Sequence, residues 1–380
     1  MRTPDNTVVT FDEAAARRVE RKDWVACGEA FLDCRIPGST GKVNYALVGM
    51  GVAQNAEQVI NIQGKHGFDL GAASMPRGVV NNLHLHFSAE VFMCWRGEWA
   101  VRWGNDGKDG EIILREGDVV SIPTWIFRGF TNIGPDDSFI FTALGQDNSG
   151  GILWAPSVIE AAAHTGLHLT RENTLFDSLP TGGQVPAGVQ LIEPMRQDEL
   201  AALRRYTPEQ MLRRLVRPAE LQWSNRATLD CLLAGGGAEL APVAGWGMSQ
   251  DRNHAPPVTN PHGLSIEWLR AAPGAGMLRH RMDCSQVLII KDGDWELVLN
   301  ESASEIRLPL RPWEVMSVPA HAWRSLRNTG STPGLVVVMN GGDARKWIDW
   351  HPSVVRAALE HDLRLDASGY VAPAHLLPVT

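Results

Sequence analysis

Three side chains that can bind a metal ion lie close together in the segment LHLHFSAEVFMCWRGEW, residues 83–99. His84 and His86 are two residues apart, and Glu90 follows four residues after His86. Side chains two residues apart on a β-strand point to the same face, and Glu90 follows a short FSA turn at the start of the next strand. All three side chains can therefore face one interior. Two imidazoles and one carboxylate are the facial ligand set of non-haem Fe(II) oxygenases, which leaves coordination positions open for substrate and oxygen.

The segments around this ligand set have the composition of short β-strands. They are rich in Val, Ile, Phe and Trp and are separated by Gly, Pro and Asp, as in GFDLGAASM, EWAVRWG, GEIILREGDVVSIP and SFIFTALG. This pattern is typical of a β-sandwich or β-barrel. Apolar residues at helical spacing occur before the strands, in TFDEAAARRVERKDWVACGEA and TPEQMLRRLVRPAELQW. We therefore expect an all-β fold with flanking helices.

The sequence repeats itself at a constant offset of 196 residues, which pairs His84 with His280. The segment LREGDVVSIPTWIFRGFTNIG aligns in this way with LRPWEVMSVPAHAWRSLRNTG, and WAPSVIEAAAHTGLHL aligns with WHPSVVRAALEHDLRL. A constant offset over such a length indicates that one unit has been duplicated. We predict two domains, a metal-binding domain at residues 1–195 and a second at residues 196–380.

Composition and charge exclude several classes of partner. The formal net charge is −8 and there is no block of basic residues, so neither nucleic acid nor an anionic membrane is expected as a partner. No run of 18 apolar residues occurs, and the first residues lack the apolar stretch of a secretory signal. The five cysteines are odd in number and lack CxxC spacing, which favours reduced thiols and a cytoplasmic location.

The motifs resemble the two-part signature of the cupin superfamily, H-x-H-x3-E-x6-G followed by G-D-x4-P. The matching residues are His84, His86, Glu90 and Gly97 in the first part and Gly117, Asp118, Pro123 and Asn132 in the second. Together with the duplication, the layout resembles bicupins, and among them gentisate 1,2-dioxygenase-like ring-cleaving enzymes. This resemblance implies two tandem cupin double-stranded β-helix (jelly-roll) barrels. It also implies iron in the N-terminal barrel, a degenerate C-terminal barrel and a homo-oligomer.

Arg128 departs from the cupin pattern, because it stands where a last metal-binding histidine is usual. Arginine stays charged and does not bind metal. Arg128 can face the pocket and pair with a substrate carboxylate beside a three-ligand metal site. Alternatively, it can pair with Glu90 and leave the site without metal.

The second copy of the motif lacks most of the metal ligands. Met282 and Gln286 occupy the places of the second histidine and the glutamate, and Arg324 occupies the place of Arg128. His280 with a thioether and an amide is a poor ligand set for a hard divalent metal. The C-terminal domain is therefore expected to have a structural role.

We assign six side chains to substrate binding from their places in the sequence. They are Arg128, Trp125 and Phe127 beside it, Trp99 and Trp103 on one face of the next strand, and Arg77 before the histidine strand. For the two tryptophans of the strand, filling the barrel interior is the default alternative.

These observations predict a non-haem Fe(II)-dependent dioxygenase that acts with O2 on a small organic acid, expected to be aromatic. His84, His86 and Glu90 would hold the iron, and Arg128 would orient the substrate carboxylate as a catalytic residue. Mn, Zn or Ni would fit the same ligands. One alternative is a metal-dependent isomerase, lyase or hydrolase on the same scaffold, in which the metal acts as a Lewis acid. Another is a metal-free bicupin that binds a small organic anion.

Overall fold

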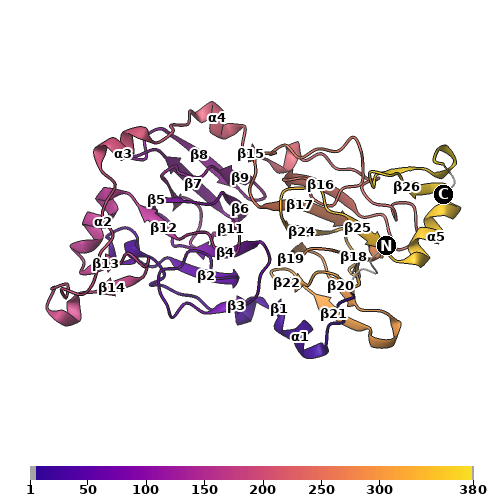
Figure 1. Cartoon of the computed structure of the whole chain (residues 1–380), viewed down its shortest axis with the longest axis horizontal. Coiled ribbons are helices and arrows are strands. Elements are labelled where there is room, and N and C mark those ends of the chain that lie inside the picture. Colours follow the sequence, from indigo (N-terminus) through magenta and orange to yellow (C-terminus); the bar gives the residue numbers. More distant parts are fainter. Residues whose placement is uncertain (1–5, 379–380) are drawn as a thin grey trace. The chain divides into compact units, whose positions relative to one another are not determined.

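The computed structural model describes residues 6–378, and β-strands dominate it (Figure 1). Residues 1–5 and 379–380, which the predicted domains include, lie outside the described residues. The chain divides into two compact units. One comprises residues 24–64 and 68–219, and the other comprises residues 6–23, 65–67 and 220–378. We call them the first and the second barrel.

The first barrel consists of two β-sheets. Its strands are β2 (Val43–Val48), β3 (Ile60–Ile62), β4 (Phe68–Ser74), β5 (Val80–His86), β6 (Glu90–Arg96), β7 (Glu98–Trp103), β8 (Gly110–Arg115), β9 (Val119–Ile122), β10 (Arg128–Asn132), β11 (Phe139–Gly145), β12 (Ile152–Trp154) and β15 (Leu215–Val216). The five-stranded sheet has the order β12-β5-β10-β7-β8, and the seven-stranded sheet has the order β15-β9-β6-β11-β4-β2-β3. Helices α2 (Pro156–Ala163), α3 (Gln197–Ala202) and α4 (Pro208–Leu212), the 3-10 turns η2 (Leu32–Arg35) and η3 (Leu179–Thr181), and the hairpin of β13 (Leu167–Leu169) and β14 (Leu175–Asp177) complete it.

The second barrel repeats this arrangement. Its strands are β1 (Arg18–Val19), β16 (Glu239–Ala244), β17 (Leu264–Ala271), β18 (Gly276–Met282), β19 (Gln286–Asp292), β20 (Trp295–Leu299), β21 (Ile306–Leu310), β22 (Val315–Val318), β23 (Arg324–Asn328), β24 (Gly334–Gly341) and β25 (Ile348–Trp350). They form a five-stranded sheet, β21-β20-β23-β18-β25, and a six-stranded sheet, β1-β22-β19-β24-β17-β16. Helices α1 (Phe11–Ala16) and α5 (Pro352–Glu360), the turns η1 (Arg21–Asp23), η5 (Ser302–Ser304) and η6 (Ala374–Leu376), and the hairpin of β26 (Leu363–Leu365) and β27 (Val371–Pro373) accompany them.

The duplication extends to individual hydrogen bonds. The Trp154 indole donates to Gln54 Oε1 over 3.1 Å, and the Trp350 indole donates to Gln250 Oε1 over the same distance. Both residue pairs are related by the offset of 196 found in the sequence. The prediction of a mostly β fold built from two copies of one barrel is therefore confirmed.

The compact units differ from the predicted division at residue 195, because the segment before each barrel joins the sheet of the other copy. Arg18 and Val19 of β1 pair with β22, and β15 pairs with β9. The Arg18 guanidinium also donates two hydrogen bonds of 2.8 Å to Glu314. Each short strand covers an edge strand that would otherwise expose unpaired backbone groups. The predicted helices are short for the same reason, since α1 ends at Ala16, before β1.

Large aromatic side chains fill the first barrel. Trp99 and Trp103 on β7 are fully buried and pack with Phe92 and Phe130. Their indole N–H groups are satisfied by backbone carbonyls, Trp99 by Arg96 at 3.3 Å and Trp103 by Tyr206 at 2.9 Å. Within residues 6–378, no helix combines the length and apolar character needed to cross a membrane.

We predict that the buried acid Glu267 on β17 makes the stability of the second barrel depend on pH. Burial raises the pKa of Glu267 to about 8 from an ordinary value of 4.5. Between pH 4.5 and about 8, the folded chain therefore keeps a proton on Glu267 that the unfolded chain has released. The contribution of Glu267 to the free energy of unfolding falls over this range and is lost by pH 8. Glu267→Gln should raise the free energy of unfolding by about 2–4 kcal/mol at pH 8.5 and much less at pH 5.

Chemical denaturation of both proteins at the two pH values measures this difference. Glu360→Gln is the matched control, because Glu360 is exposed on α5 of the same barrel. An equal effect of Glu267→Gln at both pH values would show that Glu267 does not change its protonation on unfolding.

Candidate metal centre

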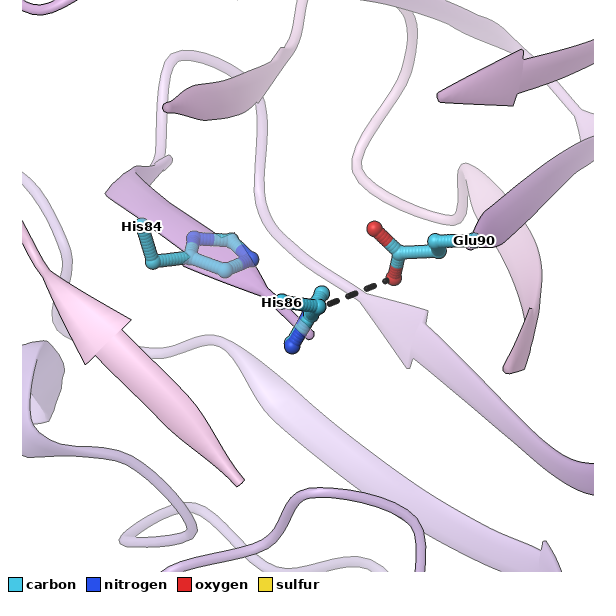
Figure 2. Close-up of side chains that lie close together, drawn as sticks. All are labelled: His84, His86 and Glu90. Carbon is cyan, nitrogen blue, oxygen red and sulfur yellow. Dashed lines mark ion pairs between the residues drawn. The ribbon is translucent and has the colours of Figure 1, made fainter. Parts of the chain in front are cut away.

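The fold brings His84, His86 and Glu90 together in the first barrel. The histidines are near the end of β5 and the glutamate begins β6, so the turn between these strands carries them into one cluster (Figure 2). All three side chains are buried, and one ligand atom of each lies within 4.8 Å of the others. Among residues 6–378, no other group of three His, Cys, Asp or Glu side chains is arranged in this way.

Backbone carbonyls orient both imidazoles. His84 Nδ1–H donates to the carbonyl of Asn82 at 2.7 Å, and His86 Nδ1–H donates to the carbonyl of Gly151 at 3.3 Å. These bonds fix the tautomer and leave both Nε2 atoms as lone-pair donors. Burial and the charge of Arg128 lower the pKa of His84 well below its ordinary value, so this imidazole is neutral at pH 7.

Arg128 forms a buried ion pair with Glu90. Its Nη2 and Nε both donate to Glu90 Oε2, over 2.7 and 3.0 Å, and its Nη1 donates to the carbonyls of His84 and Ile126. The guanidinium is fully buried and does not line the pocket. The structure thus places Arg128 against Glu90, and the predicted contact of Arg128 with a substrate carboxylate has no support.

The ion pair uses only one oxygen of the carboxylate. Glu90 Oε1 faces His86 Nε2 at 3.7 Å (Figure 2). Burial raises the pKa of Glu90, and the two hydrogen bonds from Arg128 oppose this effect by stabilising the ionised form. Oε1 and the two Nε2 atoms therefore provide one carboxylate and two imidazole donors. This set suits Mn, Fe or Zn. Arg128 orients the carboxylate through its hydrogen bonds to the other oxygen, Oε2.

The cluster lies at a partly open pocket. His84, His86 and Glu90 line it together with mainly apolar side chains, among them Leu70, Met75, Leu144, Ile152 and Trp154. Lys42, Asn44, Asn81 and Thr142 are polar members of the lining. A substrate bound here would therefore contact one cationic side chain and an apolar wall.

The other side chains that we assigned to the substrate lie elsewhere. Trp99, Trp103 and Phe127 are fully buried in hydrophobic clusters. Alternation along β7 turns Trp99 and Trp103 into a packed layer of the barrel. Trp125 is 47% exposed and its ring contacts Phe87. None of these residues lines the pocket.

Arg77 is also outside the pocket lining. Its side chain is exposed, and its Nη1 donates to the carbonyl of Gly134. The turn before β5 thus holds Arg77 on the surface, so the predicted reach into the pocket is not observed.

The polar residues of the pocket lining, among them Lys42 and Asn81, were not predicted from the sequence. Strict alternation from His84 would direct Asn82 inward. Between the pairs Arg128–His84 and Phe130–Asn81, however, one residue of β10 opposes two residues of β5. This bulge turns Asn81 into the pocket. Gly129 was the available signal, since a Cβ there would lie 2.6 Å from the carbonyl oxygen of Asn81.

The equivalent place in the second barrel lacks the ion pair. Gln286 replaces the carboxylate and donates to Asn340 Oδ1 at 3.0 Å. Arg324 is buried but donates to the carbonyls of Ala322 and Pro319, and within residues 6–378 no carboxylate pairs with it. The second barrel therefore keeps the scaffold of the site without its ligands, as the sequence predicts.

Comparisons with known proteins identify the fold. No family model matches the chain, and no curated protein does. The structure of oxalate decarboxylase from Bacillus subtilis has a TM-score of 0.51 at 12% identity, covering 90% of this chain and 78% of that chain. The formate complex of oxalate decarboxylase from Lactobacillus farciminis has a TM-score of 0.52 at 14% identity, covering 90% of both chains.

A further structure of the Bacillus subtilis enzyme comes from a study of its Mn(II) centres. It has a TM-score of 0.50 at 12% identity, covering 89% of this chain and 79% of that chain. These matches span both barrels, so the expected fold of two tandem cupin-type barrels is confirmed. The nearer resemblance to gentisate 1,2-dioxygenase-like enzymes finds no support among these structures. At such identity the similarity concerns the fold alone.

We predict that the purified protein binds one divalent metal ion through the first barrel. His84→Ala and Glu90→Ala each remove a donor and should weaken Mn(II) binding by more than roughly tenfold. Calorimetric titration of the metal-stripped protein measures this change. His280→Ala is the matched control, because His280 is the repeat equivalent of His84 and should leave Mn(II) binding unchanged. Equal effects of His84→Ala and His280→Ala would contradict the assignment.

We also predict that the two buried arginines differ in their contribution to stability. Arg128→Met leaves the Glu90 carboxylate buried without its partner and should lower the free energy of unfolding by about 3–5 kcal/mol. Arg324→Met removes a buried charge that has no carboxylate partner, so its effect should be below about 2 kcal/mol. Urea denaturation in the absence of metal compares the two variants. Equal losses would mean that the Arg128–Glu90 pair has no special role.

Proposed function

We propose that this chain is a metal-dependent enzyme of the lyase type that acts on a small organic acid. The observation that carries the proposal is the convergence of one ligand atom each from His84, His86 and Glu90 at a pocket that is otherwise mainly apolar. Three protein donors leave coordination positions for a substrate. The likeness to oxalate decarboxylases supports this class by analogy.

The residues of the site prepare it for Lewis-acid chemistry. A bound divalent ion would withdraw electrons from a substrate oxygen. The two hydrogen bonds from Arg128 favour the ionised form of Glu90 and fix the direction of Oε1, and the carbonyls of Asn82 and Gly151 hold the two imidazoles. The apolar lining excludes water and strengthens the electrostatic interactions within the pocket. Cleavage of a carbon–carbon bond next to the polarised oxygen is the reaction that this arrangement favours.

Decarboxylation is the simplest such reaction. The bond to the carboxyl carbon breaks and CO2 leaves. The electron pair moves through the neighbouring carbon to a carbonyl oxygen one carbon further on, which a bound ion would polarise, and a proton from water then replaces the lost group on carbon. No oxidant is required. We favour Mn(II) over the Fe(II) expected from the sequence, because a bicupin with similar structure was studied for its Mn(II) centres and the ligand set accepts this ion.

A dioxygenase is the second candidate, favoured by the ligand set of two imidazoles and one carboxylate. It would consume O2 with Fe(II) in the same site. The metal-free anion-binding protein has less support, because the Arg128–Glu90 pair leaves Oε1 available. Cytoplasmic location and homo-oligomer formation stay predictions.

We predict CO2 release without net O2 uptake from at least one member of a panel of 3-oxo acids and 2-hydroxybenzoates. The Mn(II)-loaded protein is assayed by mass spectrometry of both gases, and Fe(II)-loaded protein is assayed in parallel. His84→Ala should abolish turnover, and His280→Ala should retain it. One O2 consumed for each molecule of substrate would contradict the lyase and support the dioxygenase.

A further inference from the structure

We infer that Lys42 binds a carboxylate of the substrate, and that the pocket selects organic acids with an apolar body. This inference rests on the proposed function, because it takes the bound acid to be a substrate, but its test measures binding alone. Lys42 precedes β2, its side chain is buried, and it is the one Lys or Arg side chain that lines the pocket of the metal cluster.

The surroundings of Lys42 hold its ammonium group in place and leave it one hydrogen to donate. Nζ donates to Asp33 Oδ1 and, over 2.8 Å, to Asn81 Oδ1. Asp33 is fully buried, does not line the pocket, and also accepts from the backbone and side-chain N–H groups of Asn82 over 2.9 and 3.1 Å. An ammonium group has three N–H donors. The third N–H of Lys42 is thus available to a ligand.

Two aromatic rings of the pocket flank the same ammonium group. Nζ lies 5.6 Å from the centre of the Phe31 ring and 5.9 Å from that of Trp154. Both rings line the pocket, and the Trp154 ring is also 5.2 Å from the ring of His84. The free donor of Lys42 is therefore in the same part of the pocket as the metal ligands.

Asn81 connects the ammonium group with the metal cluster. Its Oδ1 accepts from Lys42, and its Nδ2 lies 3.5 Å from His84 Nδ1. A ligand that contacts both groups would place one oxygen at a bound metal ion and a carboxylate on Lys42.

The remaining wall of the pocket determines the body of the ligand. It includes Tyr45, Leu70, Met75, Phe130, Leu144 and Ile152. These side chains gain contact area only from an apolar group. Oxalate, which consists of two carboxylates, has no such group. The pocket thus suits an aromatic or branched aliphatic monocarboxylate better than oxalate.

Isothermal calorimetry of the Mn(II)-loaded full chain tests this inference with benzoate, benzyl alcohol and oxalate as probes. Wild type should bind benzoate roughly 10–100-fold more tightly than benzyl alcohol, which has the same ring without the charge. Lys42→Met should abolish this preference and keep the binding of benzyl alcohol. Lys108→Met is the matched control, since Lys108 is an exposed lysine of the same barrel.

Two further proteins separate the possible causes. Asp33→Asn with Lys42→Met removes both buried charges, so that neither is left unpaired, and this double variant should also lack the preference for benzoate. His84→Ala should retain the preference, because Lys42 provides it without the metal. If the protein shows these binding preferences but no turnover in the gas assay, the proposed function is refuted and the anion site at Lys42 is still supported.

Two results would overturn the inference. The first is wild-type protein that does not prefer benzoate to benzyl alcohol, including protein that binds neither probe, or that binds oxalate more tightly than benzoate. The second is a preference that persists in Lys42→Met and disappears in His84→Ala, which would assign the carboxylate to the metal.

Discussion

The buried ion pair between Arg128 and Glu90 is the interaction on which the rest of the site depends. Arg128 belongs to β10 of the five-stranded sheet and Glu90 to β6 of the seven-stranded sheet, so the pair joins the two sheets of the first barrel. An unpaired charge at either position would cost several kcal/mol in such an interior. Because Arg128 uses only Oε2, it holds the carboxylate in one orientation and leaves Oε1 beside the imidazoles. An arginine in the place of a histidine is therefore compatible with a metal centre.

The second barrel shows what the scaffold becomes when this pair is absent. Its His280 keeps the hydrogen bond from Nδ1–H to the carbonyl of Leu278, as His84 does with Asn82. With Gln286 in place of the glutamate, Arg324 bonds to backbone carbonyls and the amide bonds to Asn340. The same topology thus supports a ligand set in one copy and a packed interior in the other.

The sequence predicts those features that depend on local spacing. The offset of the repeat predicts two barrels, and alternation on one strand places His84 and His86 together. The features that it missed depend on contacts between distant segments. The bulge that turns Asn81 inward arises from the pairing of β5 with β10, and Lys42 meets Asn81 only after folding. Trp99 lies in a packed layer and outside the pocket lining, a distinction that closeness to the motif in the sequence does not provide.

The most direct test of this account is a crystal structure of the protein soaked with Mn(II), with anomalous diffraction used to locate the ion. The account predicts one anomalous peak in the first barrel, bound by His84 Nε2, His86 Nε2 and Glu90 Oε1, with Arg128 still hydrogen-bonded to Oε2. A structure without a peak at this cluster, or with Arg128 displaced from Glu90 by the ion, would contradict it.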